Sequence, residues 1–311
     1  MIVTVFVPEP EPEITPEILE LTDPSRPDWR EPGRPRPVRV MLWRPADDSG
    51  SGRVPAVLIS HGTGGAARQL AWLAEPLAAA GFLVAGVDHH GNNLVDGYLP
   101  QGFAFEWERP RDLSFALDVL AADHELGPVG AAGFSSGGYT AAALVGARIS
   151  AAVLDAIATG QLVLPEIPEF PGLPGALRAA VSEAELAQSM VAGAGDYSDA
   201  RIAAAFLICP ALGRLLSPES LGQITKPVRL SWGGADLIAP AQLNALLYQD
   251  AIPGATGESA GPDVEHYHFL GGNPEGTAVR ERVAADAVAF FQKSLGSSSP
   301  VTHVAHWNDR R

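Results

Sequence analysis

The sequence predicts an α/β fold in which helices cover both faces of a mostly parallel, twisted sheet. From Pro55 onward, short apolar runs alternate with longer Ala/Leu-rich amphipathic stretches, which is the pattern of strands alternating with helices. The chain has 311 residues, enough to bury a large core within one domain. Hydrophobic residues make up 46% and charged residues 18%, so burial of apolar surface can offset the entropy lost on ordering.

The expected elements follow one another through most of the chain. Strands are expected at 38–43, 56–60, 82–87, 129–133, 202–208 and 228–232, and helices at 69–80, 112–125, from 137 onward, and at 279–295. Gly81 is placed to end the first helix, although Pro76 lies inside it. The segments 148–155 and 201–208 resemble each other, and we favour the second as the strand because a Cys-Pro pair and a loop follow it.

The domain organisation follows from breaks in this alternation. Residues 8–37 are rich in proline and in both signs of charge, and we expect residues 1–37 to form an extended N-terminal arm. Residues 38–295 form the expected folded domain. Within it, residues 158–200 are punctuated by proline and break the alternation, which predicts a small inserted cap. Residues 296–311 are Ser-rich at their start, and we expect a flexible tail.

Charge and composition exclude several classes of function. The net charge is −15, so the surface should repel phosphate backbones, and nucleic acid is not an expected partner. No apolar run approaches the roughly 20 residues that cross a bilayer, and the N-terminus lacks the basic start of a signal peptide. We expect a cytoplasmic protein, although a secreted protein without its leader would look the same. The single cysteine, Cys209, lies in an apolar run and is expected to be a buried, inert thiol.

The most informative motif is GFSSGG at residues 133–138. It contains the G-x-S-x-G pattern and stands between an expected strand and an expected helix, the context of a nucleophile elbow. A serine in such a turn adopts a strained backbone conformation, and the flanking glycines remove side chains that would clash. Ser135 is therefore the predicted nucleophile. The helix start beyond it favours developing negative charge, so the Ser136 N–H is a predicted oxyanion donor.

The second oxyanion donor and the acid are expected after other strands. The motif SHGTGG at residues 60–65 follows the strand 56–60, and the Thr63 N–H is the predicted second donor. His61 in this motif is more typical of a loop-ordering residue than of a catalytic base. Asp236 follows the strand 228–232 and is the predicted acid, with Asp155 as the alternative if the run before it were a strand.

The base is expected last in the chain, in the order Ser, Asp, His that this fold uses. His266 and His268 both lie in the segment VEHYHF before the final helix, and the residues alone leave the choice between them open. Neither these histidines nor the pair His89-His90 have the ligand spacing of a metal site, so no metal or other cofactor is expected.

With these motifs the chain resembles the α/β-hydrolase superfamily. Within that superfamily it resembles the bacterial dienelactone hydrolase-like group, which borders the platelet-activating-factor acetylhydrolases and the cutinase-like polyester hydrolases. The resemblance covers most of residues 23–293 and rests on DPSR at 23–26, the segment 38–45, SHGTGG at 60–65, DHHGN at 88–92, RDLSFALDVL at 111–120, GFSSGGYTA at 133–141, DARIAAAF at 199–206, WGGADLIAP at 232–240 and EHYHFL at 265–270. It implies an α/β-hydrolase fold with a catalytic domain over 38–295, and it selects His266 as the base, since the motif places the histidine before an aromatic residue. Phe134 stands where the group commonly has histidine.

These residues predict a serine hydrolase that cleaves small carboxylic esters of short-chain, aryl or lactone type. Phe103 and Trp107 lie in expected loops and, with His61, are the candidate substrate-binding residues. An amide hydrolase with the same triad is the nearest alternative. A ligand-binding protein that uses the same pocket without turnover is the alternative from another class, and labelling of Ser135 by a fluorophosphonate would distinguish it.

Overall fold

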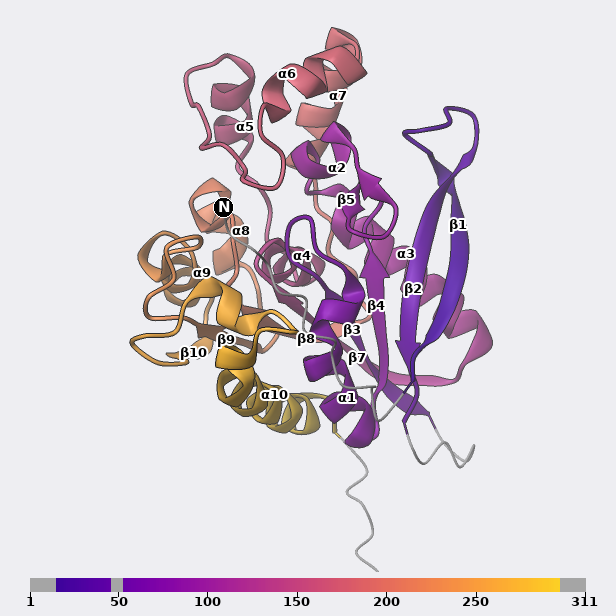
Figure 1. Ribbon diagram of the computed structural model, residues 1–311, viewed down its shortest axis with the longest axis vertical. Helices are drawn as coiled ribbons and strands as arrows, with labels where there is room; N and C mark the ends of the chain where they lie inside the picture. The colour runs from indigo at the N-terminus through magenta and orange to yellow at the C-terminus, as the bar shows by residue number, and fades with distance from the viewer. Residues whose placement is uncertain (1–14, 46–52, 297–311) are drawn as a thin grey trace, which may run out of the picture.

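The computed structural model describes residues 15–45 and 53–296. Its centre is a sheet of eight strands in the order β1-β2-β4-β3-β7-β8-β9-β10 (Figure 1). Strands β2 to β4 and β1 to β2 pair antiparallel, and the remaining pairs are parallel. The strands are β1 (Glu17–Pro27), β2 (Pro35–Trp43), β3 (Val54–Ser60), β4 (Leu83–Asp88), β7 (Leu126–Phe134), β8 (Ile202–Ile208), β9 (Val228–Trp232) and β10 (Thr256–Ser259). The predicted mixed sheet, mostly parallel, is confirmed.

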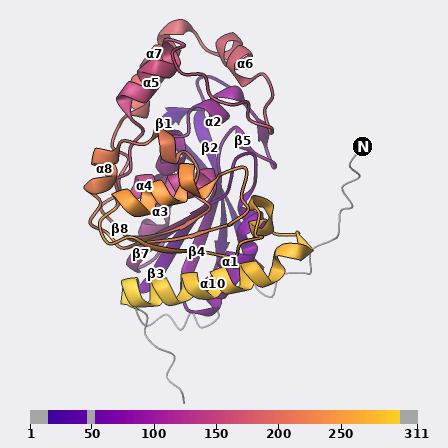
Figure 2. The same cartoon turned by 90° about the vertical axis from the view of Figure 1, so that its left-hand side faces the viewer.

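Helices cover both faces of the sheet and create two hydrophobic cores. Along β3, Leu58 faces one core while its neighbours Val57 and Ile59 face the other, because successive side chains of a strand point to opposite sides. Helices α1 (Ala71–Ala79) and α10 (Thr277–Phe291) pack together on one face (Figure 2). The other face is covered by α3 (Glu108–Asp123), α4 (Ser136–Leu144), α8 (Pro218–Gly222) and α9 (Ala245–Ala251).

Shorter elements complete the described chain. The small ribbon β5 (Asn92–Asn93) and β6 (Gly97–Tyr98) precedes α2 (Pro100–Ala104), and α5 (Ala151–Ala158), α6 (Leu173–Ala180) and α7 (Glu183–Gly193) lie between α4 and β8. Single turns of 3-10 helix lie at η1 (Ala67–Leu70), η2 (Gly213–Leu215), η3 (Ala241–Leu243), η4 (His266–Phe269) and η5 (Pro274–Gly276), and η6 (Gln292–Gly296) is a π turn. Within the described ranges, no helix combines the length and apolar character needed to cross a bilayer.

Two expected strands have the predicted bounds, and the choice between the two similar segments is confirmed. Strands 202–208 and 228–232 are β8 and β9, whereas residues 151–158 form the helix α5. Helix α3 begins at Glu108, one turn before the predicted 112, because Pro110 is tolerated in a first turn. The predicted helix 69–80 divides into η1 and α1.

The predicted N-terminal arm is corrected by β1. Residues 17–27 form an edge strand paired with β2 instead of running outside the sheet, and β2 begins at Pro35 rather than at 38. An edge strand tolerates proline and charge because one side of its backbone needs no partner, so the composition concealed the strand. Residues 1–14 of the arm and 297–311 of the predicted tail lie outside the described residues.

The predicted cap segment, residues 158–200, includes α6 and α7. Figure 1 shows both helices with α5 at one end of the molecule, beyond the main sheet. Phe170 of this segment lies edge-on against Phe103 of α2, with ring centroids 5.0 Å apart, and Phe103 lies against Tyr98 in turn. An aromatic cluster of three rings therefore connects the cap segment to the loops at the sheet edge.

A buried ion-pair network fastens β1 and β2 to α3. Arg26 is 3% exposed and contacts Asp23 at 2.7 Å, Asp112 at 2.7 Å and Glu108 at 3.1 Å. Arg36 of β2 contacts Glu108 at 2.9 Å. Because these charges are out of water, each depends on its partners more than a surface charge does.

We expect the substitution Arg26→Met to lower the free energy of unfolding by about 3–5 kcal/mol, since it removes the arginine that pairs with the buried carboxylates of Asp23 and Asp112. The matched control is Arg44→Met, which removes an exposed pair with Glu17 and should cost about 1 kcal/mol or less. Denaturant unfolding measures both. Equal losses in the two variants would contradict the network's role.

Candidate active site

Ser135 lies at the tip of a sharp turn between β7 and α4. Its backbone has φ 56° and ψ −119°, a strained conformation that residues other than glycine rarely adopt. A Cβ atom at Gly133 would overlap the backbone carbonyl of Gly137, and one at Gly137 would overlap that of Ser60. Only glycine therefore allows β3, β7 and α4 to approach this closely, which accounts for the spacing of the motif.

Asp236, His266 and Ser135 form a continuous hydrogen-bonded chain. His266 Nδ1 lies 2.7 Å from Asp236 Oδ2, and His266 Nε2 lies 3.0 Å from Ser135 Oγ. A carboxylate can only accept, so Nδ1 carries the proton and Nε2 is left to accept one from the serine hydroxyl. The three residues come from the loop after β9, from η4 and from the β7–α4 turn, and all three are buried.

The Asp236 carboxylate is held in its ionised form. Burial alone would raise its pKa, but the hydrogen bond and charge of His266 and the backbone N–H groups of Ala239 and Ile238 outweigh burial and lower the pKa. Those N–H groups donate to Asp236 Oδ1 at 2.7 and 2.9 Å. The His266 ring also packs on Phe134, with centroids 4.7 Å apart. Phe134 thus supports the imidazole from behind the elbow.

His268, the alternative base, lies elsewhere. Its Nδ1 accepts from the backbone N–H of Glu265 at 2.9 Å, and its Nε2 is 3.8 Å from Glu275. The structure therefore brings His266 and not His268 to Ser135. Asp155, the alternative acid, lies in α5 and is not part of the hydrogen-bonded chain.

The two predicted oxyanion donors are neighbours. Thr63 and Ser136 are linked through their side chains, with Oγ1 and Oγ 2.7 Å apart. Ser136 begins α4, where backbone N–H groups lack intrahelical acceptors. The loop around Thr63 is fixed on its other side, because Asn92 accepts from the Gly64 N–H and the Tyr98 hydroxyl donates to the Gly64 carbonyl at 2.8 Å. Asn92 and Tyr98 were not among the predicted site residues.

The three candidate substrate-binding side chains are packed inside the protein. His61, Phe103 and Trp107 are at most 2% exposed. Both ring nitrogens of His61 form hydrogen bonds within the protein. Nδ1 lies 2.6 Å from the Gly62 carbonyl oxygen, and Nε2 accepts from the His89 N–H at 3.2 Å. Trp107 belongs to the core, and Phe103 to the aromatic cluster. Their side chains make contacts within the protein.

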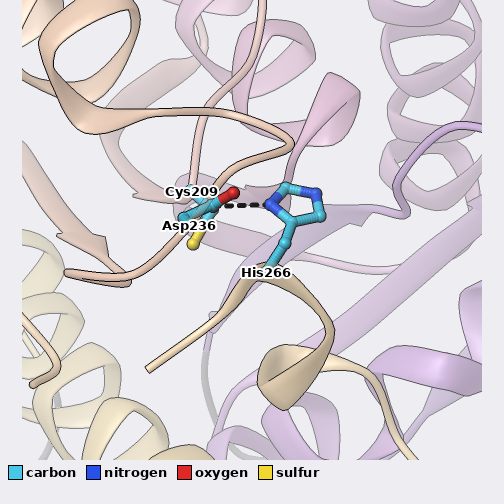
Figure 3. A group of neighbouring side chains, drawn as sticks. All are labelled: Cys209, Asp236 and His266. Carbon is cyan, nitrogen blue, oxygen red and sulfur yellow. Dashed lines mark hydrogen bonds and ion pairs between the residues drawn. The ribbon is translucent and has the colours of Figure 1, made fainter. Parts of the chain in front are cut away.

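Cys209 lies against the acid, as the sequence did not predict. Its sulfur and ligand atoms of Asp236 and His266 lie within 4.8 Å of one another (Figure 3). Burial and the charge of Asp236 raise the pKa of the thiol, whereas a metal ligand must be a thiolate. Asp236 and His266 are already hydrogen-bonded to each other, so Cys209 is better described as packed against this pair than as a metal ligand. The expected burial of Cys209 is confirmed.

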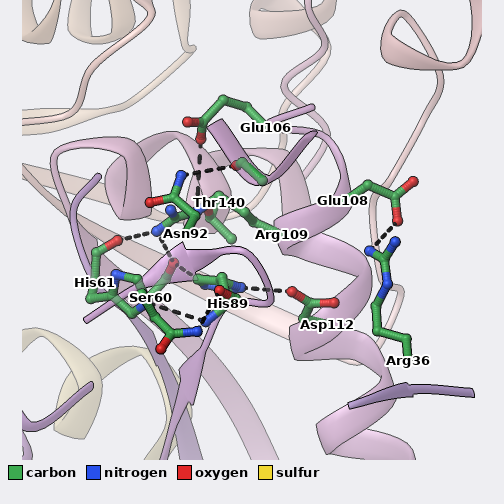
Figure 4. Close-up of polar contacts among 12 residues, drawn as sticks. Arg36, Ser60, His61, His89, Asn92, Glu106, Glu108, Arg109, Asp112 and Thr140 are labelled. Carbon is green, nitrogen blue, oxygen red and sulfur yellow. Dashed lines mark hydrogen bonds and ion pairs between the residues drawn. The ribbon is translucent and has the colours of Figure 1, made fainter. Parts of the chain in front are cut away.

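A second Ser-His-Asp chain lies beneath the site. Ser60 Oγ is 2.8 Å from His89 Nε2, and His89 Nδ1 is 2.9 Å from Asp112 Oδ2 (Figure 4). Ser60 has no exposed surface and ends an ordinary strand, so no substrate reaches it. Burial, and then the charge of Arg109, lower the pKa of His89 to about 4. This chain is structural.

Comparisons with known proteins agree with this architecture. The family model described as "Serine aminopeptidase, S33" matches residues 53–185. The structure is similar to that of a ferulic acid esterase from Streptomyces cinnamoneus, with a TM-score of 0.60 and 20% identity over 94% of each chain. A search of curated proteins finds no match. The chain has the α/β-hydrolase fold. Neither match is to the dienelactone hydrolase-like group that its motifs resemble.

We expect Gly137→Ala to abolish activity and to destabilise the fold, since the added methyl would overlap the Ser60 carbonyl. The matched control is Gly175→Ala on the exposed side of α6, where nothing lies within 4 Å and alanine should stabilise the helix by about 0.5–1 kcal/mol. Esterase assays and thermal unfolding measure both. A stable, active Gly137→Ala variant would contradict the packing described for the turn.

Acid should destabilise the protein before its carboxylates titrate. Burial, followed by the charge of Arg109, holds the pKa of His61 and that of His89 below the usual value of 6.5. The unfolded chain therefore binds more protons below about pH 6.5, and the free energy of unfolding falls there by up to about 1.4 kcal/mol per pH unit for each histidine.

Denaturant unfolding between pH 7 and 5 measures this slope. His89→Gln should reduce it, whereas His124→Gln, at a half-buried position in the loop after α3, is the control. Stability that does not change over this range would exclude neutral buried histidines.

Proposed function

We propose that this chain hydrolyses carboxylic esters through an acyl-enzyme formed on Ser135. The observation that carries the proposal is the hydrogen-bonded chain from Asp236 through His266 to a serine on a strained turn. This arrangement supplies a nucleophile, a base in the required tautomer and an ionised acid to orient it.

In the proposed reaction, Ser135 Oγ attacks the acyl carbon while His266 Nε2 takes the hydroxyl proton. The carbonyl electron pair moves onto oxygen, where the backbone N–H groups of Thr63 and Ser136 stabilise it. As the C–O bond to the alcohol breaks, the His266 imidazolium returns the proton to the leaving oxygen. Water then attacks the acyl-serine by the same steps, which releases the acid and restores Ser135. Asp236 stays ionised and stabilises the imidazolium.

Apolar side chains next to the triad favour an ester with an apolar or aromatic group. Leu237 is 88% exposed and Ile238 52%, and both directly follow Asp236. Tyr267, which follows His266, is 45% exposed. Exposed apolar groups beside a reactive centre are typical of a substrate-contacting surface. The similarity to a ferulic acid esterase supports the same class, as do the motifs of the dienelactone hydrolase-like group, and we propose short-chain, aryl or lactone esters.

Amide hydrolysis is the second candidate, and the match to the serine aminopeptidase model favours it. The same residues would catalyse either reaction, because the two differ in the leaving group that His266 must protonate. Matched pairs of a p-nitrophenyl ester and a p-nitroanilide with one acyl group separate the two activities. A higher kcat/KM on the anilide, corrected for intrinsic reactivity, would make the chain an amidase.

A fluorophosphonate probe followed by mass spectrometry should label Ser135. In Ser135→Ala we expect no labelling, unchanged thermal stability and a loss of kcat of about 10³-fold or more, with the residual rate coming from binding and oxyanion stabilisation. His266→Ala should lose a similar factor, while the matched control His268→Ala should keep most of the activity. Near-wild-type turnover by folded Ser135→Ala would end the proposal. A loss of activity in His268→Ala but not in His266→Ala would make His268 the base.

A further inference from the structure

Two buried charged residues beneath the oxyanion loop have no part in the proposed reaction. Glu106 precedes α3 and is 8% exposed, and Arg109 lies in the first turn of α3 and is 2% exposed. Arg109 Nε lies 3.7 Å from Glu106 Oε2. Figure 4 shows both side chains above His89 and beside Thr140 of α4. Burying an ion pair here is costly unless its hydrogen bonds are also made.

The Arg109 guanidinium joins the two elements that carry the oxyanion donors. One of its nitrogens, Nη2, donates to the His61 carbonyl, two residues before Thr63. Its Nε donates to Thr140 Oγ1 at 3.2 Å, and that hydroxyl donates to the Ser136 carbonyl at 3.0 Å. The loop after β3 and the first turn of α4 are thus held by one planar cation with a fixed donor geometry.

Glu106, the acidic partner of the ion pair, is linked to Ser136 and Thr63 through their side-chain hydroxyls. Ser136 Oγ is 3.4 Å from Glu106 Oε1 and 2.7 Å from Thr63 Oγ1. A carboxylate accepts and does not donate, so the Ser136 hydroxyl donates to Glu106 and the Thr63 hydroxyl donates to Ser136. The direction of every bond in the chain follows from the carboxylate at its end.

We propose that Glu106 and Arg109 are positioning residues that hold the Thr63 and Ser136 backbone amides at the spacing an oxyanion requires. The two amides belong to separate elements, and an oxyanion hole works only if its donors are fixed before the charge develops. The pair is also electrically neutral, so it fixes the amides without placing an uncompensated negative charge beside the developing oxyanion. The inference rests on the proposed ester hydrolysis and adds a structural requirement to it.

The substitution Thr63→Val tests the chain at its far end. Valine keeps the backbone N–H and nearly the same shape but removes the hydroxyl. We expect kcat to fall about tenfold with KM within about twofold, because only stabilisation of the transition state is lost. The rate at which a fluorophosphonate labels Ser135 should fall by a similar factor, since its phosphoryl oxygen also needs the two amides. Thr63→Ser should recover most of both losses.

The ion pair is tested by replacing both partners together, Glu106→Met with Arg109→Met, so that no buried charge is left alone. We expect kcat and the labelling rate to fall about tenfold, as in Thr63→Val, with KM within about twofold. Because both changes cut one chain, combining them with Thr63→Val should cost about tenfold in total rather than the product of the separate losses. Thr256→Val, at an exposed position of β10, controls for the exchange of threonine for valine.

The outcomes separate this inference from the function it rests on. A folded Thr63→Val variant with wild-type kcat and labelling rate would overturn the positioning role while leaving ester hydrolysis intact. Independent, multiplicative losses in the combined variant, or a change in KM alone, would also overturn it. A wild-type protein that neither labels nor hydrolyses any ester would overturn the proposed function and this inference with it.

Discussion

The close approach of three backbones at Gly133, Gly137 and Ser60 is the constraint on which the site depends. With no side chain at either glycine, β7 turns into α4 directly above the end of β3. This contact forces Ser135 into its strained conformation, and it also brings the loop that carries Thr63 against the start of α4. The proposed nucleophile and oxyanion donors are therefore placed by one packing contact, whereas Asp236 and His266 come from loops that are distant in the sequence.

Beneath this contact the protein replaces apolar packing with a directional polar network. Arginines from β1, β2 and α3 face carboxylates of the same region, and buried histidines fill the space between them. Apolar side chains tolerate small shifts, but hydrogen bonds between buried charges lose much of their strength when geometry changes. Such a network suits the proposed site, in which the oxyanion donors must not move. It also makes the stability of the protein sensitive to the loss of any one partner.

The sequence predicts those site residues best whose signal lies in a short stretch of neighbouring residues. Ser135 is identified by five residues, and Asp236 by its position after a strand. The choice of His266 over His268 needed a family resemblance, because neighbouring histidines carry no spacing that distinguishes them. Glu106 and Arg109 could not have been found, since charged residues near the start of a helix usually face solvent. Their roles come from contacts with the loop after β3 and with α4, which only the folded chain brings beside them.

The proposed acid and the proposed base are each followed by an exposed residue. Asp236 is buried while Leu237 is almost fully exposed, and buried His266 precedes half-exposed Tyr267. In the proposed reaction, the inward residue of each pair takes part in the chemistry and the outward residue contacts the substrate. Under the proposed function, single substitutions of the outward residues would alter which esters are accepted while the inward residues keep their hydrogen bonds.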